Sequence, residues 1–337
     1  MSREPSPVRI VDVVSSDVEA VSGAGGGWQG RNLQVSRGTM RYHSRRLLLP
    51  GLGIRRHETD ATLHGLWSND RGAFSLVCGD TDAPQARHGG RDVATDRFLF
   101  QHAGPEHDML FPAGYRCWDL DVYADTCQAR GWVFAMDATP PLPPRVRAAL
   151  DHLCTAAFAQ VERHPAGAAG LTAIEAHALA EQVLGAVERI VPHVLGHDPE
   201  ALARTDARGA RRAIVQDAAA QLRSMGPDQV ASVPALAASL GISERTLYLA
   251  FQRTLGVGPY EFHRLERLHA FRRGLLAGDR RRGIITREAL RAGFSDPSRL
   301  ASAYRRQFGE TPRQTLKRWG GAPPSGAGRA RTRSTGR

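Results

Sequence analysis

The sequence has few cysteines and no long apolar run, and each absence excludes a class of protein. The four cysteines form no Cys-x-x-Cys pair, which argues against a zinc site and against a disulfide scaffold. We therefore expect reduced, buried thiols at Cys78, Cys117, Cys127 and Cys154. No apolar run approaches the roughly 18 residues that a membrane helix needs, and the N-terminus lacks the apolar segment of a signal peptide. These absences predict a cytoplasmic protein without a membrane partner.

Lysine is almost absent, and the basic charge that arginine supplies is unevenly distributed. Residues 201–337 contain 26 basic and 10 acidic residues, a net charge of +16, whereas residues 1–200 have a net charge of −5. A preference for arginine over lysine does not explain why the first 200 residues are acidic. A basic domain is typical of proteins that bind a polyanion, since neutralising phosphates releases condensed counterions. We therefore favour a nucleic-acid partner over a basic face that only contacts solvent.

The first part of the chain has the pattern of a β-rich domain. Residues 28–138 contain short apolar or alternating segments separated by Gly, Asp and Pro, which is typical of strands joined by turns. Regularly spaced short strands predict a sandwich or a small barrel. Residues 1–27 end in a Gly-rich stretch and are predicted to be a flexible N-terminus.

The periodicity changes after the Pro-rich stretch at 139–145. Apolar residues then recur every three to four positions, which indicates amphipathic helices, and we assign 146–197 as a helical linker or dimerisation segment. A basic all-α domain is expected over 200–319. Residues 320–337 are rich in Gly, Pro, Ser and Arg and are predicted to be a disordered basic tail. The predicted fold class is α+β.

The basic domain contains one pattern twice: a short helix, a turn at a glycine, and a second helix ending at a glycine. In the first copy the helix caps and glycines are Ser232, Gly241, Ser243 and Gly256. In the second copy they are Thr286, Gly293, Asp296 and Gly309. This is helix-turn-helix anatomy. One such pattern is weak evidence, but two in tandem on a strongly basic segment indicate a DNA-binding domain.

Apolar positions recur in both copies and are predicted to form the small core between the paired helices. They are Leu236, Leu240, Ile242, Leu247 and Phe251 in the first copy, and Leu290, Phe294, Leu300, Tyr304 and Phe308 in the second. Between the copies, 259–278 is predicted to be one helix of about 27 Å. Successive major grooves on one side of B-DNA lie about 34 Å apart, so this helix could hold two recognition helices in adjacent grooves.

The second copy carries a specific signature. Its members are Gly293, Phe294, Ser298, Leu300, Tyr304, Arg305, Arg306, Phe308, Gly309 and Pro312. On these residues, Ser232 to Trp319 resembles the DNA-binding domain of the AraC/XylS family of transcription regulators. The stretch GFSDPSRLASAYRRQFGETPRQTL is similar to the branch that contains ethanolamine-operon regulators. The resemblance implies a double helix-turn-helix domain that binds promoter DNA, preceded by a cupin-like, effector-sensing N-terminal domain.

Recognition helices contact base edges from the exposed face of their first two turns. In the first motif that face is predicted to carry Glu244, Arg245, Tyr248, Leu249, Gln252 and Arg253, opposite the buried Leu247 and Phe251. Family members often have Arg where this chain has Leu249, which could contact a thymine methyl or simply pack. Arg245 is therefore the best candidate for a guanine contact, with Tyr248 and Gln252 next.

The recognition helix of the second motif carries smaller side chains. Its expected exposed positions are Pro297, Ser298, Arg299, Ala301 and Ser302, with Arg305 and Arg306 further along as phosphate contacts. Only Arg299 is long enough to reach a base, and it could equally hold a phosphate. The structural residues of this motif are predicted to be Gly293, Phe294, Tyr304 and Phe308. We expect this motif to fix register on the DNA backbone, while the first motif carries most sequence choice.

No catalytic residue, metal site or cofactor is predicted. No Ser/His/Asp set or Gly-rich phosphate loop is found, and no His-x-His pair is followed by the carboxylate that cupin metal sites generally use. His102 and His107 are the only close pair, and their spacing does not place both on one strand face. One alternative stays open: Cys117 beside Arg116 could be a thiol of low pKa.

The sequence thus predicts a transcription regulator, controlled by an unknown small-molecule effector and acting on a promoter site in double-stranded DNA. The resemblance implies contact with RNA polymerase, and a homodimer is possible. Two alternatives remain open. One is a ligand-independent dimeric DNA-binding protein, and the other is a DNA-binding domain fused to an enzymatic barrel.

Overall fold

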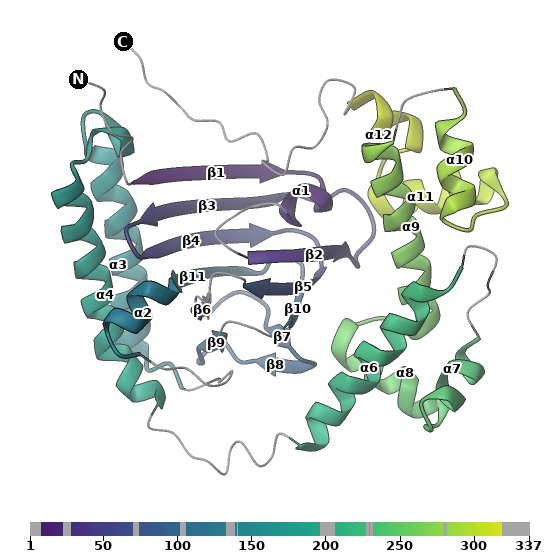
Figure 1. The fold of residues 1–337 in the computed structure, drawn as a ribbon, viewed down its shortest axis with the longest axis horizontal. Helices are drawn as coiled ribbons and strands as arrows, with labels where there is room; N and C mark the ends of the chain where they lie inside the picture. Colours follow the sequence, from purple (N-terminus) through teal and green to yellow (C-terminus); the bar gives the residue numbers. More distant parts are fainter. Residues whose placement is uncertain are drawn as a thin grey trace.

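The computed structural model combines a strand-rich N-terminal half with a helical C-terminal half, as Figure 1 shows. It describes residues 8–22, 28–69, 74–101, 106–132, 139, 141–195, 206–226, 229, 232–278 and 282–318. The predicted α+β class is therefore confirmed, with β structure and helices segregated along the chain.

The N-terminal half contains two antiparallel sheets. The first sheet has the order β1 (Arg9–Ser15), β3 (Tyr42–Leu49), β4 (Leu52–Thr59), β11 (Arg116–Val122), β6 (Phe74–Gly79) and β9 (Leu99–Gln101). The second sheet has the order β2 (Trp28–Gln34), β5 (Leu63–Asn69), β10 (His107–Phe111), β7 (Ala86–His88) and β8 (Arg91–Val93). Two short helices, α1 (Val18–Ser22) and α2 (Ala124–Ala129), follow β1 and β11.

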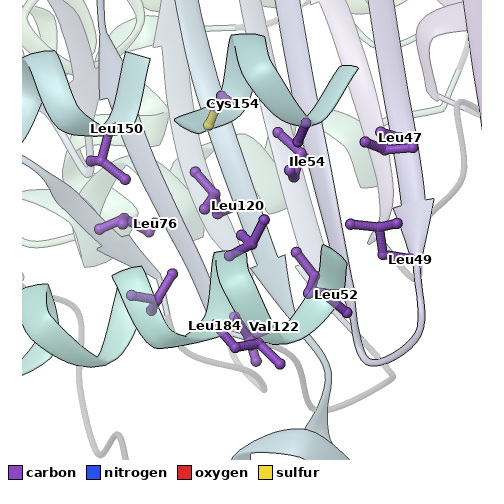
Figure 2. Packing of buried hydrophobic residues seen from close by; sticks show 14 of the residues in the cluster. Leu47, Leu49, Leu52, Ile54, Leu76, Leu120, Val122, Leu150, Cys154 and Leu184 are labelled. Atoms are coloured by element: carbon purple, nitrogen blue, oxygen red, sulfur yellow. The ribbon is translucent and has the colours of Figure 1, made fainter. Parts of the chain in front are cut away.

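The first sheet has two faces of different chemistry, because successive side chains of a strand alternate between faces. One face packs against helices α3 (Pro144–Arg163) and α4 (Ala173–Leu195), which a short turn, η1 (Gly167–Gly170), connects. Figure 2 shows Leu47, Ile54 and Leu120 in this apolar core beside Cys154 of α3. The opposite face is turned toward the second sheet and carries buried polar side chains, among them Ser75, Asp119 and Asp121.

The prediction of a flexible N-terminus over 1–27 is wrong for residues 9–22. Arg9–Ser15 forms β1 and pairs with β3 along its whole length. Val8 and Val13 are buried, and Val18 and Val21 of α1 lie in a cluster with Met40 and Leu63. The alternating apolar residues of this segment favour a buried strand and helix, although the segment ends in a Gly-rich stretch. The remaining residues of this predicted segment, like the predicted tail at 320–337, lie largely outside the described residues.

The C-terminal half contains seven helices within its described part. They are α6 (Asp206–Ser224), α7 (Val233–Ser239), α8 (Glu244–Leu255), α9 (Pro259–Ala277), α10 (Ile284–Arg291), α11 (Pro297–Phe308) and α12 (Pro312–Arg318). The first helix pair, α7 and α8, and the second, α10 and α11, lie at opposite ends of α9 (Figure 1). The double helix-turn-helix arrangement and the single connecting helix are confirmed.

Most of the predicted helix boundaries hold for a physical reason that the structure makes visible. The hydroxyls of Ser232 and Ser243 accept hydrogen bonds from the first-turn N–H groups of α7 and α8, and the Asp296 carboxylate does the same for α11. The prediction that Thr286 caps the short helix is wrong, because the cap is Gly283, three residues earlier, and α10 begins at Ile284. Leu290 was predicted in the core but is 58% exposed, while Ala289 is buried instead.

The helical half is joined to the second sheet and to α1 by buried polar contacts. The side-chain amide of Gln34, at the end of β2, donates to the backbone carbonyl oxygen of Gln307 of α11 at 3.3 Å. The side-chain amide of Gln307 donates in turn to the backbone carbonyl oxygen of Gln34 at 2.8 Å. Arg272 of α9, which is 2% exposed, donates to Asp17 beside α1 and to Glu310. We call this set of contacts the interdomain joint. It fixes the second helix pair against the strand-rich half.

Candidate nucleic-acid interface and interior cavity

Helix α8 presents one apolar face to the protein and one mixed face to solvent. Leu247 and Phe251 are fully buried, as predicted. On the other side Tyr248 is 50% exposed and Leu249 is 38% exposed, and both are among the few large apolar side chains that reach solvent. Arg245 is exposed beside them in the first turn. This is the position from which a recognition helix contacts base edges.

The remaining predicted residues of α8 fall into two groups. Glu244 and Arg253 are exposed. Gln252 is only half-buried, and its side-chain amide lies 3.2 Å from the Tyr248 hydroxyl oxygen. Gln252 therefore supports the ring of Tyr248, and its own reach toward DNA is smaller than the sequence indicated.

Helix α11 exposes a face of small side chains. Leu300, Tyr304 and Phe308 are buried as predicted, while the predicted structural residue Phe294 is half-buried and Gly293 adopts a positive φ of 77° at the turn. The predicted contact residues of this helix are all exposed, namely Ser298, Arg299, Ser302, Arg305 and Arg306.

Arg299 is the one long side chain among the first-turn positions of α11 named above. Its side chain is 90% exposed, and its Nε lies 3.3 Å from a carboxylate oxygen of Asp296, the cap of the same helix. Such an exposed ion pair stabilises a protein only weakly. Arg299 can therefore exchange Asp296 for a DNA phosphate at little cost.

Helix α9 belongs to the cores of both helix pairs and sets their separation. Phe262 and Leu265 lie in the cluster that contains Phe251 of α8. Phe271 lies one turn and a half further along and packs with Tyr304 of α11, their ring centroids 5.4 Å apart. Because one continuous helix enters both cores, the two recognition helices are held at a fixed spacing.

An interior cavity lies between the two sheets. Its apolar lining is Val21, Leu63, Trp67, Val77, Met109 and Phe111, and its polar lining is Asn32, Tyr42, Arg55, His57, Thr59, Gln101 and Asp119. Mostly apolar walls with a few converging polar groups are typical of a small-molecule site.

The polar end of this cavity holds titratable groups in an unusual state. Burial, ahead of the charges nearby, lowers the pKa of His57 to about 4, so its imidazole is neutral. Burial opposes ionisation of Asp119, but the adjacent Arg55 brings its pKa below the ordinary value. The Cys117 Sγ lies 2.7 Å from the His57 Nε2, and burial raises the pKa of this thiol. The alternative of a low-pKa Cys117 is therefore wrong.

All four cysteines are free and buried, as the sequence predicted. Three of them, Cys78, Cys127 and Cys154, lie in the core between the first sheet and the helices that cover it. No helix in the described part of the chain is both long enough and apolar enough to cross a membrane.

Comparison with known proteins places the C-terminal half. Residues 236–318 match the family model described as a helix-turn-helix domain. The chain is 37% identical over 83 residues to the regulatory protein HrpB of Ralstonia nicotianae, covering 25% of this chain and 17% of that protein. It is 33% identical over 89 residues to the probable thc operon regulatory protein of Rhodococcus erythropolis, covering 26% of this chain and 27% of that protein. A solved structure of a probable AraC family transcriptional regulator from Rhodopseudomonas palustris is 32% identical, with a TM-score of 0.28, covering 33% of this chain and 97% of that one.

This region is a helix-turn-helix domain. Such a domain implies binding to double-stranded DNA, and α8 and α11 are the second helices of its two motifs. The chain spans less than a third of the length of the curated relatives that it matches. What the whole protein regulates, and in response to what, is therefore a matter for a proposal.

The sequence predicted the exposed residues of the helix-turn-helix domain but missed the polar end of the cavity. His57 and Cys117 are far apart in the chain, and only the pairing of β4 with β11 makes them directly opposite each other. Asp119, two residues further along β11, lies on the same face. The segment Cys-Trp-Asp-Leu-Asp of β11 was the available signal, because its cysteine and two aspartates alternate with apolar residues and so share one face of the strand.

Proposed function

We propose that this chain is an AraC-type transcription regulator whose interior cavity binds a small-molecule effector that controls DNA binding. The single observation that carries the proposal is that the cavity and the interdomain joint share two elements, α1 and β2. A displacement of either element therefore changes both the cavity and the interdomain joint. The cavity supplies the binding site, and the joint supplies the connection to the AraC-type domain.

The shared elements can be followed residue by residue. Asn32 of β2 lines the cavity, and Gln34, two residues further on, binds Gln307 of α11. Val21 of α1 also lines the cavity. In the same helix Glu19 lies 3.5 Å from Arg273 of α9. A ligand that displaces either wall moves a contact of the joint.

The interdomain joint can couple the cavity to DNA binding only if the effector binds two arrangements of the protein with different affinity. An effector changes DNA binding by as much as its affinity differs between two arrangements of the AraC-type domain. In the described arrangement, α11 is tied to the strand-rich half through Gln307, and the backbone N–H of Gly38 donates to the Gln307 carbonyl oxygen at 3.0 Å. An effector that favours another arrangement must weaken these contacts.

The other partners expected from the sequence belong to the same proposal. Contact with RNA polymerase and membership of the ethanolamine-operon branch follow from the family resemblance alone. A homodimer would need a surface other than the apolar sides of α3 and α4, because these sides are buried against the first sheet. The exposed sides of these helices, where Ile174 is 82% exposed, remain for a dimer.

The test uses the full chain with a library of metabolites. An effector raises the melting temperature, because a ligand stabilises the native state by RT ln(1 + [L]/Kd), and it also changes the Kd for a selected DNA site. Val77→Trp fills the cavity and should abolish both effects while DNA binding without ligand persists. Val14→Trp is the matched control, since Val14 of β1 is 61% exposed and does not line the cavity, and it should leave both effects unchanged.

Three results would contradict the proposal in different ways. Ligands that stabilise the protein without changing its Kd for DNA would refute effector control. A tight dimer that binds DNA and responds to no metabolite would favour the ligand-independent alternative. Chemical turnover of a stabilising metabolite would favour the enzymatic one.

A further inference from the structure

Three side chains of different chemistry converge at the polar end of the cavity. His57 of β4 and Cys117 of β11 are direct cross-strand partners, and Asp119 follows on the same face of β11. The Cys117 Sγ lies 2.7 Å from the His57 Nε2 and 3.4 Å from the Asp119 Oδ1, and the His57 Nε2 lies 3.7 Å from the Asp119 Oδ2. Among the described residues, no other group of three potential metal ligands lies this close together.

The geometry does not fit a nucleophile activated by a histidine. In such a triad the carboxylate binds the imidazole nitrogen that faces away from the nucleophile. Here Cys117 and Asp119 both approach the same nitrogen, Nε2, while the Nδ1 of His57 is buried without a hydrogen-bond partner. Three potential donors therefore surround one point, which is the arrangement of a coordination site.

The donor set matches a particular class of ion. Imidazole, thiolate and carboxylate together are ligands for Zn²⁺ and similar borderline transition-metal ions, whereas Mg²⁺ and Ca²⁺ prefer oxygen alone. Arg55 donates through Nε to the Asp119 Oδ2 at 2.8 Å, and this leaves Oδ1 on the side of Cys117. Such an outer contact orients a carboxylate ligand.

We propose that His57, Cys117 and Asp119 bind one Zn²⁺-class ion at the end of the interior cavity. Bonds of about 2.0 Å to nitrogen and 2.3 Å to sulfur hold these two atoms about 3.5 Å apart in a tetrahedral site. The side chains of His57 and Cys117 must therefore separate by less than about 1 Å. Binding forms a metal–sulfur bond, and the thiol proton of Cys117 passes to solvent.

The ion has one coordination position left, and the cavity determines its direction. His57 and Asp119 both line the cavity, whereas Cys117 does not. The fourth position therefore faces the cavity, where water or a donor atom of a small molecule completes the tetrahedron. Thiolate and carboxylate together contribute two negative charges, and Arg55 stays paired with Asp119.

The experiment uses the full chain, freed of metal by a chelator and titrated with Co²⁺ as a spectroscopic substitute for Zn²⁺. We expect one Co²⁺ per chain, with visible bands of tetrahedral intensity and an ultraviolet thiolate-to-cobalt charge-transfer band. Zn²⁺ should displace it. Cys117→Ser should lose the charge-transfer band and weaken Co²⁺ binding at least tenfold. Cys154→Ser is the matched control, since Cys154 is equally buried but lies in α3, and it should keep the band.

A second measurement needs no variant and so does not depend on whether Cys117→Ser folds. X-ray absorption at the zinc edge of the Zn²⁺-loaded protein should show one sulfur neighbour among nitrogen and oxygen neighbours. No stoichiometric binding, an octahedral cobalt spectrum, or a zinc site without sulfur would each overturn the proposal. Neither measurement involves DNA or an effector, so its outcome is independent of the regulator function proposed above.

Discussion

The second helices of the two helix-turn-helix motifs, α8 and α11, differ in what they expose. Helix α8 exposes Arg245 together with large side chains, Tyr248 at 50% and Leu249 at 38%. Helix α11 exposes Ser298, Ser302 and other small side chains at its first two turns, and Arg299 pairs there with the cap of its own helix. Side chains long enough to discriminate bases are thus concentrated on the first helix.

The two helices also differ in how the strand-rich half holds them. Helix α11 is tied by the Gln34–Gln307 contacts and by the backbone N–H of Gly38. Helix α8 meets that half through Thr254, which lies against Gly90, and through an apolar cluster that includes Leu33 of β2. The helix with the longer exposed side chains is therefore held by apolar packing, and the other helix by buried hydrogen bonds. We infer that α8 selects the sequence and that α11 fixes the position of the domain.

The largest predicted effect concerns the restraint on the second motif. Arg272→Ala should lower the free energy of unfolding by about 3–5 kcal/mol, because it leaves the buried carboxylate of Asp17 without its cation, whereas Glu310 keeps Arg318. Urea denaturation measures this loss. Arg291→Ala is the matched control, since the Arg291 side chain is 68% exposed and paired with Glu288, and it should change stability by about 0.5 kcal/mol or less. Equal losses in the two variants would show that the joint contributes nothing.

The next effect concerns base discrimination by α8. Arg245→Ala should weaken binding to the preferred site by about 1–3 kcal/mol and relax the preference at one base pair. Arg299→Ala, the corresponding change on α11, should weaken binding to all duplexes alike, because a phosphate contact carries no sequence information. Fluorescence anisotropy with a set of single-substitution duplexes separates the two outcomes. The comparison fails if Arg245→Ala lowers every affinity by one factor.

The smallest predicted effect comes from placing a longer, charged side chain on the exposed face of α11. Ser302→Arg should raise affinity for duplex DNA by about 0.5 kcal/mol and steepen the dependence of log K on log salt by about 0.9. Titrations at several salt concentrations give both numbers. A new base preference without a change in salt dependence would mean that α11 enters the groove closely enough to contact bases.

The sequence predicted the parts of this molecule that depend on local chemistry. Ser232, Ser243 and Asp296 cap helices because a short side-chain oxygen reaches the first free N–H groups of its own helix. The prediction of Thr286 as a cap failed because Gly283, with a positive φ of 87°, already begins that helix. Leu290 matched the helical period but lies on the exposed side of a short helix.

The features that the sequence did not predict depend on contacts between distant residues. Gln34 and Gln307 are 273 positions apart, and nothing near either residue indicates the other. The convergence of His57 with Cys117 and Asp119 depends on the register of β4 against β11, which is set by the whole hydrophobic pattern of the sheet. Residues 9–22 were underestimated because their partner strand, β3, lies beyond a Gly-rich stretch.

One measurement tests the division between the two recognition helices most directly. Binding sites are selected from a random duplex library with the full chain, and the binding free energy is then measured for every single base-pair substitution across the selected site. We predict that the sensitive positions cluster in the segment contacted by α8, with losses of about 1–3 kcal/mol each. The adjacent groove segment, contacted by α11, should tolerate substitution with little loss. Equal sensitivity in both segments would contradict the account.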